Sequence, residues 1–428
     1  MKQKRLIPLA VAVLLAGVAG TAQADDGGLQ FNGYLRSGVG ESTGGGGGSQ
    51  ACFKLAGASS KYRLGNECET YAELALGKQL YKDPDDGATF SVHTRMAMSA
   101  TQWQDWEDTG NNNKNLSFAF REAYGEASNI GLGSASVWAG KRFYDRHDVH
   151  IIDYYFWDNS GPGAGIENID LGFGKLAYAW RQNTYDSGDT SVDGLDHKVG
   201  VSGHDFRLSG LKVNEGGELT LGLDIRHASK QPGDTYDQST NGYAMNIMHT
   251  QGGFLGGYNT IAFQYQTGDI SGGYSSPNPN ANKDDKTERL VEQVQWQMPG
   301  TRFSGMGVAL WQRQEPKAGA AQTWTSVGLR PEYYFTKHLG MAVELGHDQV
   351  HVDDGTPTRQ LTKLTTALLI SPDSGFWSRP QLRLFATYAK WNTAAQQAAG
   401  SLDALSTTGA FGSQTHGMTV GAQVEAWW

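Results

Sequence analysis

Hydrophobic and polar residues alternate along this chain from near its start to its last residue. In Met418–Trp428, Val420 and Trp428 share one face, while Gln423 and Glu425 share the other. An apolar face opposite a polar one is typical of a strand that separates lipid from water. Similar alternating runs occupy residues 31–39, 69–76, 88–100, 135–143, 168–181, 218–228, 243–250, 260–267, 289–298, 306–313, 324–335, 340–351, 361–370 and 381–391.

Clusters of turn-forming residues separate these runs, and no helical period is sustained over three turns. A sheet that spans a membrane must close on itself, because lipid offers no partner to an unpaired strand edge. A spanning strand with its share of turn and loop uses roughly 20–25 residues, so the chain has room for about 16–20 strands. Barrels of about that size enclose a water channel. We therefore predict an all-β protein, a transmembrane antiparallel β-barrel with a pore. The clearest turn clusters are Gly44–Gly48, Asp83–Gly87, Asn111–Asn113, Asp186–Asp189 and Ser275–Asp285.

The first residues have the form of a secretory signal. Three basic residues precede the apolar stretch Leu6–Val18, and Ala22–Ala24 is a small-x-small cleavage site. The apolar stretch is too short to span a bilayer. The sequence thus predicts a signal peptide at residues 1–24 and one barrel domain over residues 25–428.

Composition agrees with an exported barrel better than with a soluble enzyme. Glycine is 57 of 428 residues, about twice its ordinary usage, and Trp and Tyr together number 30. After the leader, no apolar run reaches the ~18 residues of a helical span. The net charge is -9, or -12 once the three basic residues of the leader are removed. This acidic balance argues against a nucleic-acid partner.

Two cysteines, Cys52 and Cys68, follow the signal. An even number of cysteines in an exported chain favours a disulfide. It would close a loop of about 17 residues, worth roughly 3 kcal/mol by loop entropy. A disulfide with a purely structural role is the favoured interpretation, and metal binding by two lone cysteines is disfavoured.

Five aromatic residues break the pattern, because they share the polar parity of their segments: Tyr34, Tyr71, Tyr258, Trp377 and Trp427. Aromatic rings in a water channel suit sugars, since a sugar ring has an apolar C–H face. Stacking on that face contributes about 1 kcal/mol per ring. The sugar hydroxyls then need hydrogen-bond partners in the protein, because each hydroxyl that loses its bonds to water without replacement costs ~1–3 kcal/mol. Charged side chains near the aromatics would supply them.

Lys141–Gly165 is the densest cluster of charged and aromatic residues, and we predict that it folds inward to narrow the pore. Its end, Gly161–Gly165, has the composition of a turn. Metal ligation is an alternative for four of its residues: His147, Asp148, His150 and Asp153. Their spacing matches no zinc signature, so we predict neither metal nor cofactor.

Four segments resemble the maltoporin family, the trimeric outer-membrane maltodextrin channels of Gram-negative bacteria. They are SKYRLGNECETYAEL (Ser60–Leu74), Trp138–Leu176, WSRPQLRLFATYAKW (Trp377–Trp391) and the terminal AQVEAWW. The resemblance, weaker between these segments, covers nearly the whole mature chain. It implies an 18-stranded antiparallel barrel, three barrels per assembly, and a third loop folded into each pore as a constriction.

The resemblance also implies roles for individual residues. An aromatic slide that guides the sugar would comprise Tyr34, Tyr71, Trp106, Tyr258, Trp377 and Trp427, with Trp106 lent by a neighbouring subunit and Tyr258 at a position where the family often has Phe. A polar track would comprise Arg36, Arg63, Glu73, Arg121, Arg146, Asp148, His150 and Asp153, with Tyr155 facing the slide. Sucrose-type relatives replace the residues that match Arg146, Tyr155 and Asp158, so their retention favours maltodextrins.

We therefore predict a non-enzymatic outer-membrane channel for facilitated diffusion of maltose and maltodextrins, with outer-membrane lipid and two further copies of the chain as its partners. Three alternatives remain open. The first is a general porin whose lumen aromatics are incidental. The second is an outer-membrane barrel hydrolase, although no Ser-His-Asp spacing is recognisable. The third is a soluble, secreted, sugar-binding β-sandwich.

Overall fold

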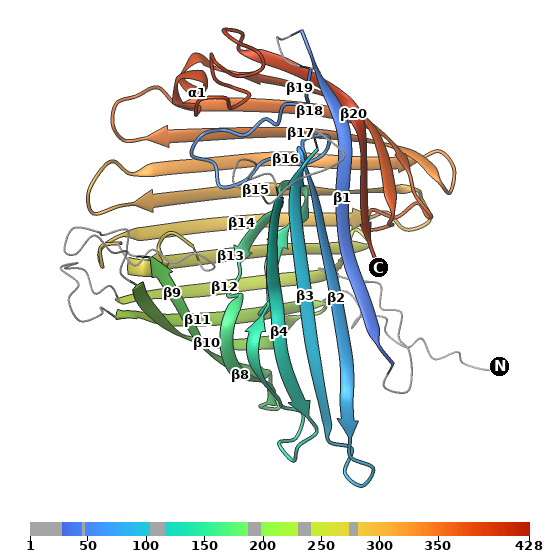
Figure 1. Ribbon diagram of the computed structural model, residues 1–428, viewed down its shortest axis with the longest axis vertical. Helices are drawn as coiled ribbons and strands as arrows, with labels where there is room; N and C mark the ends of the chain where they lie inside the picture. The colour runs from blue at the N-terminus through green and yellow to red at the C-terminus, as the bar shows by residue number, and fades with distance from the viewer. Residues whose placement is uncertain (1–27, 45–47, 103–115, 187–197, 230–240, 274–280) are drawn as a thin grey trace.

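Eighteen antiparallel strands form one closed sheet in the computed structural model, which describes residues 28–44, 48–102, 116–186, 198–229, 241–273 and 281–428. Each strand pairs with the next strand of the sheet along the chain, and β20 pairs back onto β1 over ten residue pairs, Tyr34↔Trp427 to Thr43↔Met418. Figure 1 shows β1 in blue lying beside β20 in red. The predicted 18-stranded barrel is confirmed. Its strands are β1 (Gln30–Thr43), β2 (Glu69–Lys82), β3 (Thr89–Thr101), β4 (Leu116–Ser128), β5 (Ser136–Arg142), β8 (Gly161–Asp170), β9 (Lys175–Asp186), β10 (Lys198–Asn214), β11 (Gly217–Ser229), β12 (Asn241–Phe254), β13 (Gly257–Thr267), β14 (Lys286–Gln297), β15 (Phe303–Glu315), β16 (Gln322–Tyr334), β17 (Leu339–Val352), β18 (Arg359–Ile370), β19 (Gln381–Trp391) and β20 (His416–Trp427).

Side chains alternate between the two faces of the sheet as the sequence predicts. In β19, Leu382 and Leu384 are 51% and 54% exposed on the outer face, whereas Arg383 between them is 2% exposed on the inner face. Apolar residues outside and polar residues inside are what a barrel in lipid requires. No helix in the described residues is long and apolar enough to cross a membrane.

Short turns join the strands at one end of the barrel and longer segments join them at the other. The segment between β5 and β8 carries the hairpin β6 (His147–Val149) and β7 (Tyr154–Trp157), joined by the 3-10 turn η1 (His150–Ile152). We call residues 143–160 the constriction loop. A six-residue helix, α1 (Thr393–Ala398), lies between β19 and β20.

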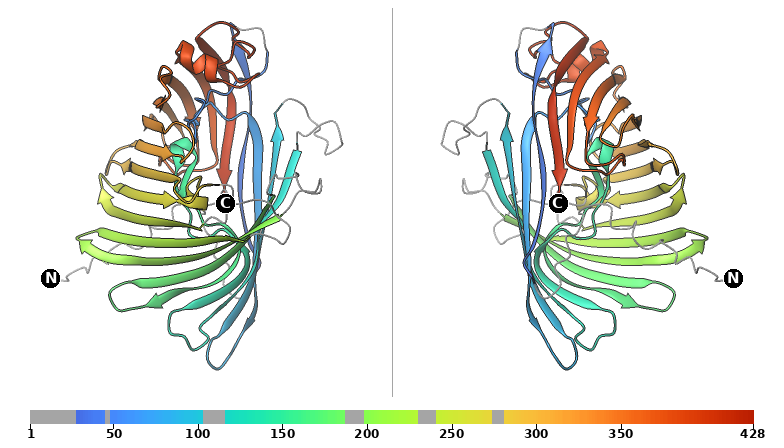
Figure 2. Two further views of the ribbon diagram at one scale, coloured as in Figure 1. Left: turned by 90° about the vertical axis from the view of Figure 1, so that its left-hand side faces the viewer. Right: turned by 90° about the vertical axis from the view of Figure 1, so that its right-hand side faces the viewer.

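The main apolar core lies inside the barrel, between the loops and one wall. Residues of the constriction loop and of residues 48–68, which we call loop 1, pack together on the inner side of β12–β19. Figure 2 shows the constriction loop in teal and loop 1 in blue near the yellow and orange strands of that wall. The strip of interior beside β1–β4 is left lined by polar and partly exposed side chains.

Loop 1 is fixed at two places. The predicted disulfide between Cys52 and Cys68 is present and closes its base. Farther along, Tyr62 is 2% exposed and its hydroxyl lies 2.9 Å from the Ser326 hydroxyl. Its ring lies over Gly328 and Gly346, where an added Cβ would come within 2.1 Å of a ring carbon. Only glycine at these two strand positions leaves space for the ring.

Some predicted elements are wrong. Gly161–Gly165 is not a turn but the first half of β8, because its glycines face crowded neighbours: a Cβ on Gly163 would lie 2.4 Å from the Trp180 carbonyl oxygen. The run 168–181 spans the end of β8, a turn and the start of β9. Strands β4 and β10 were not predicted, and both carry a bulge that shifts the alternation.

We expect Gly328→Val to displace loop 1, because the new side chain occupies the place of the Tyr62 ring. Overpacking of this kind costs about 1–3 kcal/mol. Trypsin cleavage at Lys54 and Lys61 in the detergent-solubilised protein should therefore become faster. Gly125→Val is the matched control, since a Cβ there meets only the Ser91 carbonyl oxygen at 3.7 Å. Unchanged cleavage in Gly328→Val would contradict the proposed seat for loop 1.

Candidate functional site

Four of the predicted lumen aromatics form one line across the inner surface. Trp427 of β20 lies directly opposite Tyr34 of β1 in the sheet. The Tyr34 and Tyr71 ring centroids are 6.0 Å apart, and those of Trp377 and Trp427 are 6.3 Å apart. The line therefore runs from the turn before β19, across β20 and β1, to β2. We call these four rings the aromatic line.

The other predicted aromatics differ in their placement. Trp377 belongs to the β18–β19 turn rather than to a strand, so strand parity was the wrong reason for placing it inside. It is held there by packing against the interior apolar cluster. Tyr258 of β13 packs against the same cluster, and no ring contact in the described residues joins it to the aromatic line. Trp106 lies outside the described residues.

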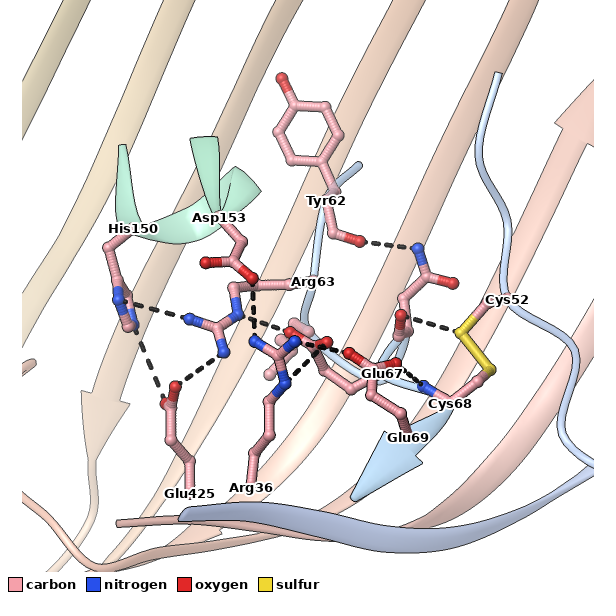
Figure 3. Close-up of polar contacts among 12 residues, drawn as sticks. Arg36, Cys52, Tyr62, Arg63, Glu67, Cys68, Glu69, His150, Asp153 and Glu425 are labelled. Atoms are coloured by element: carbon pink, nitrogen blue, oxygen red, sulfur yellow. Dashed lines mark hydrogen bonds and ion pairs between the residues drawn. A yellow bond between two sulfur atoms is a disulfide. The ribbon is translucent and has the colours of Figure 1, made fainter. Parts of the chain in front are cut away.

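Charged side chains of loop 1 and the constriction loop meet around Arg36 and Glu425 (Figure 3). Arg36 forms ion pairs with Glu69 at 2.5 Å and with Asp153 of the constriction loop at 2.8 Å. Arg63 of loop 1 forms an ion pair with Glu67 at 2.6 Å and donates to the Tyr34 hydroxyl at 2.6 Å. These contacts join both inward loops to β1.

The carboxylate of Glu425 is the centre of this charge network, and sequence reasoning did not assign it a role. It is 0% exposed and has ion pairs with three guanidinium groups, those of Arg63 at 3.0 Å, Arg379 at 2.7 Å and Arg383 at 2.5 Å. A buried carboxylate needs such partners, because desolvation of an unpaired charge is costly. Its inward parity beside Trp427 was visible in the sequence, but its partners come from a loop, a turn and another strand.

His150 lies between the charge network and the aromatic line. Its ring meets Trp377 edge-on at a centroid distance of 5.0 Å and Trp427 at 6.0 Å. Burial holds the pKa of His150 well below its usual value, against the opposing charge of Glu425 and together with the charges of Arg63 and Arg379. The imidazole is therefore neutral at pH 7. His147 instead faces Asp145 at 3.3 Å and packs on Trp157, so the two histidines have different surroundings.

A second set of polar side chains, Arg146, Asp148 and Tyr155, lies on the constriction loop. The Arg146 guanidinium lies 4.4 Å from the centre of the Tyr155 ring, which is 39% exposed. Burial, followed by the nearby Asp153 charge, raises the pKa of Asp148 to about 6. On the facing strands, Glu73 accepts from the Tyr71 hydroxyl at 2.5 Å and pairs with Arg95 at 2.9 Å. Arg95 was missed, although its parity on β3 is inward.

A closed 18-stranded barrel whose interior carries an inward loop, aromatic rings and paired charges has the build of a porin. The LamB porin family model matches residues 29–428. The chain belongs to the LamB porin family. As a LamB porin it is a channel protein of the bacterial outer membrane.

Solved structures of other proteins share the fold of this LamB porin. OccAB1 of Acinetobacter baumannii is 13% identical with a TM-score of 0.50, over 95% of this chain and 99% of that one. OccAB2 of the same organism is 9% identical with a TM-score of 0.50, over 94% of this chain and 98% of that one. At these identities the likeness concerns the barrel alone.

Glu425→Gln tests the charge network of this porin. The neutral amide leaves three guanidinium groups without their shared carboxylate, so we expect a loss of about 3–5 kcal/mol in folded-state stability. The temperature at which the folded barrel unfolds in detergent, followed by gel mobility, measures it. Glu315→Gln removes an exposed partner of Arg313 and should change stability by less than about 1 kcal/mol. Equal stability of the two variants would contradict the role of Glu425.

Proposed function

We propose that this porin passes maltose and maltodextrins by facilitated diffusion, with the aromatic line as the path of the sugar. The observation that supports it best is the backbone pairing of Trp427 with Tyr34, which brings the contacting rings of Trp377 and Trp427 and those of Tyr34 and Tyr71 onto neighbouring parts of the inner wall. Successive sugar rings of a linear glucan would stack along it, each contact contributing about 1 kcal/mol. Tyr258, and Trp106 of a neighbouring subunit, would extend this slide.

Hydroxyl groups of the sliding sugar would bond to the polar track beside the rings. Arg36, Arg63, Glu73 and Asp153 lie next to the aromatic line. Charged partners bond hydroxyls more strongly than neutral ones do. When each sugar hydroxyl exchanges one protein partner for the next, the glucan can advance without leaving a hydroxyl unpaired. His150, Asp148, Arg121, Arg146 and Tyr155 would complete the track at the constriction.

Transport requires binding that favours entry and still permits exit. An affinity near millimolar, about -4 kcal/mol, meets both needs. The concentration gradient supplies the direction. We further propose a homotrimer in outer-membrane lipid, because the resemblance to maltoporins implies three barrels per assembly and a ring shared between neighbours.

Sugar block of ion current tests this proposal. In a planar bilayer, maltohexaose should reduce single-channel current in a concentration-dependent way. The double variant Trp377→Ala with Trp427→Ala loses two stacking contacts, roughly 2 kcal/mol, so half-block should need about 30 times more sugar.

Phe263→Ala serves as the control, because Phe263 is 43% exposed on the outer face. Maltohexaose should half-block the current through this variant at the same concentration as in the unmodified protein. A general porin with incidental aromatics is the better description in two cases. In the first, maltohexaose does not block the current of the unmodified channel. In the second, it half-blocks the double variant and the unmodified channel at the same concentration.

A further inference from the structure

Three arginine side chains surround one aromatic ring where β5 enters the constriction loop. The guanidinium carbons of Arg95, Arg121 and Arg146 lie 5.3 Å, 4.9 Å and 3.5 Å from the centre of the Phe143 ring. The backbone N–H of Phe143 donates to Glu122 at 3.0 Å, which fixes the ring to β4. Cation–π contacts of this kind hold the guanidinium planes in place. Three positive charges are thus collected within one short stretch of the pore wall.

The three arginines differ in how their charge is balanced. Arg95 is neutralised, since it forms ion pairs with Glu73 at 2.9 Å and Glu122 at 2.6 Å. For Arg121 and Arg146, the contacts of the described residues comprise aromatic rings and no carboxylate within 4.0 Å. Both side chains are only partly buried. Within the part of the chain that the structure describes, neither guanidinium group has a hydrogen-bond acceptor among its contacts.

We propose that Arg121 and Arg146 together form a binding site for an oxyanion, so that the channel takes linear glucans bearing a phosphate or sulfate group as well as neutral ones. This inference rests on the proposed function and names a further substrate class. A guanidinium group offers a planar pair of donors that matches phosphate oxygens. Because both groups share the Phe143 ring, their carbons are no farther apart than the sum of their distances to it. Both groups therefore lie in one short section of the pore wall.

Arg121 and Arg146 lie where they could bind a phosphate or sulfate group on a sugar that moves along the aromatic line. Tyr71 ends the aromatic line, its hydroxyl bonds Glu73, and Glu73 pairs with Arg95, which lies over the same Phe143 ring as the pair. A glucan stacked on Tyr71 would thus present a substituent toward Arg121 and Arg146. Asp148 of the constriction loop interacts electrostatically with Arg146, and its negative charge opposes an anion at the site. Its pKa of about 6 makes that opposition weaker below pH 6.

The test compares two probes on the full channel: maltohexaose, and maltohexaose carrying one phosphate ester. In a planar bilayer at 0.1 M KCl and pH 7, the phosphorylated sugar should reach half-block of the current at about a tenfold lower concentration, the gain of two partly exposed charge contacts. At 1 M KCl the advantage should shrink, because salt screens exposed charges.

The double variant Arg121→Gln with Arg146→Gln should bring the ratio of the two half-block concentrations close to one. Arg313→Gln is the matched control, since Arg313 forms exposed ion pairs with Glu315 and Asp353 away from the constriction. It should keep the tenfold ratio.

Each outcome of these measurements supports or contradicts the anion site or the proposed function. Equal block by both sugars in the unmodified channel overturns the anion site while leaving the proposed function intact. A ratio that survives in the double variant also overturns it. Absence of block by maltohexaose contradicts the proposed function, and preferential block by the phosphate ester alone would still support the anion site. If the double variant does not insert, the ratio in the unmodified channel and its dependence on salt decide.

Discussion

Closure of the backbone ladder is the constraint from which the rest of this structure follows. In lipid no water is available to an unpaired N–H or C=O group, so β20 must pair back onto β1. Closure forces every strand to alternate, with one face toward lipid and the other toward the interior. Side chains that would be exposed on a soluble protein therefore meet inside one cylinder, where residues far apart in the sequence become neighbours. The contact between Tyr34 and Glu425 is a direct product of this closure.

The interior created in this way is too wide to be filled by strand side chains, and loops divide it. Loop 1 and the constriction loop cover one wall and bury an apolar core against it. Their inner edges carry charges that are matched by charges on β1 and β20. The same ion pairs that hold the loops also define the boundary of the remaining passage. Stability and the shape of the passage thus depend on the same contacts, with Glu425 common to many of them.

Properties that depend on strand period were predictable from the sequence, and those that depend on contacts between distant segments were not. Alternation placed Tyr34, Tyr71 and Trp427 inside, because the two faces of a strand are a local property. It failed for Gly161–Gly165, where glycines reflect crowding by neighbouring strands rather than a turn. The roles of Glu425 and Arg95 were missed, since the partners of Glu425 come from a loop, a turn and another strand, and those of Arg95 from the two neighbouring strands.

The charged residues beside the aromatic line fall into two physical classes. Arg36, Arg63 and Arg95 form ion pairs with carboxylates, and these contacts fix the inner wall beside the aromatic line. Arg121 and Arg146 are held by aromatic rings instead, and among the described residues neither contacts a hydrogen-bond acceptor. A passage built only of the first class would offer a solute charged groups that already share their charge with a partner. One built only of the second would carry uncompensated charge along its length and retain any anion that entered. For the function and the anion site that we propose, combining the two classes would give weak contacts along most of the path and one stronger contact at the constriction.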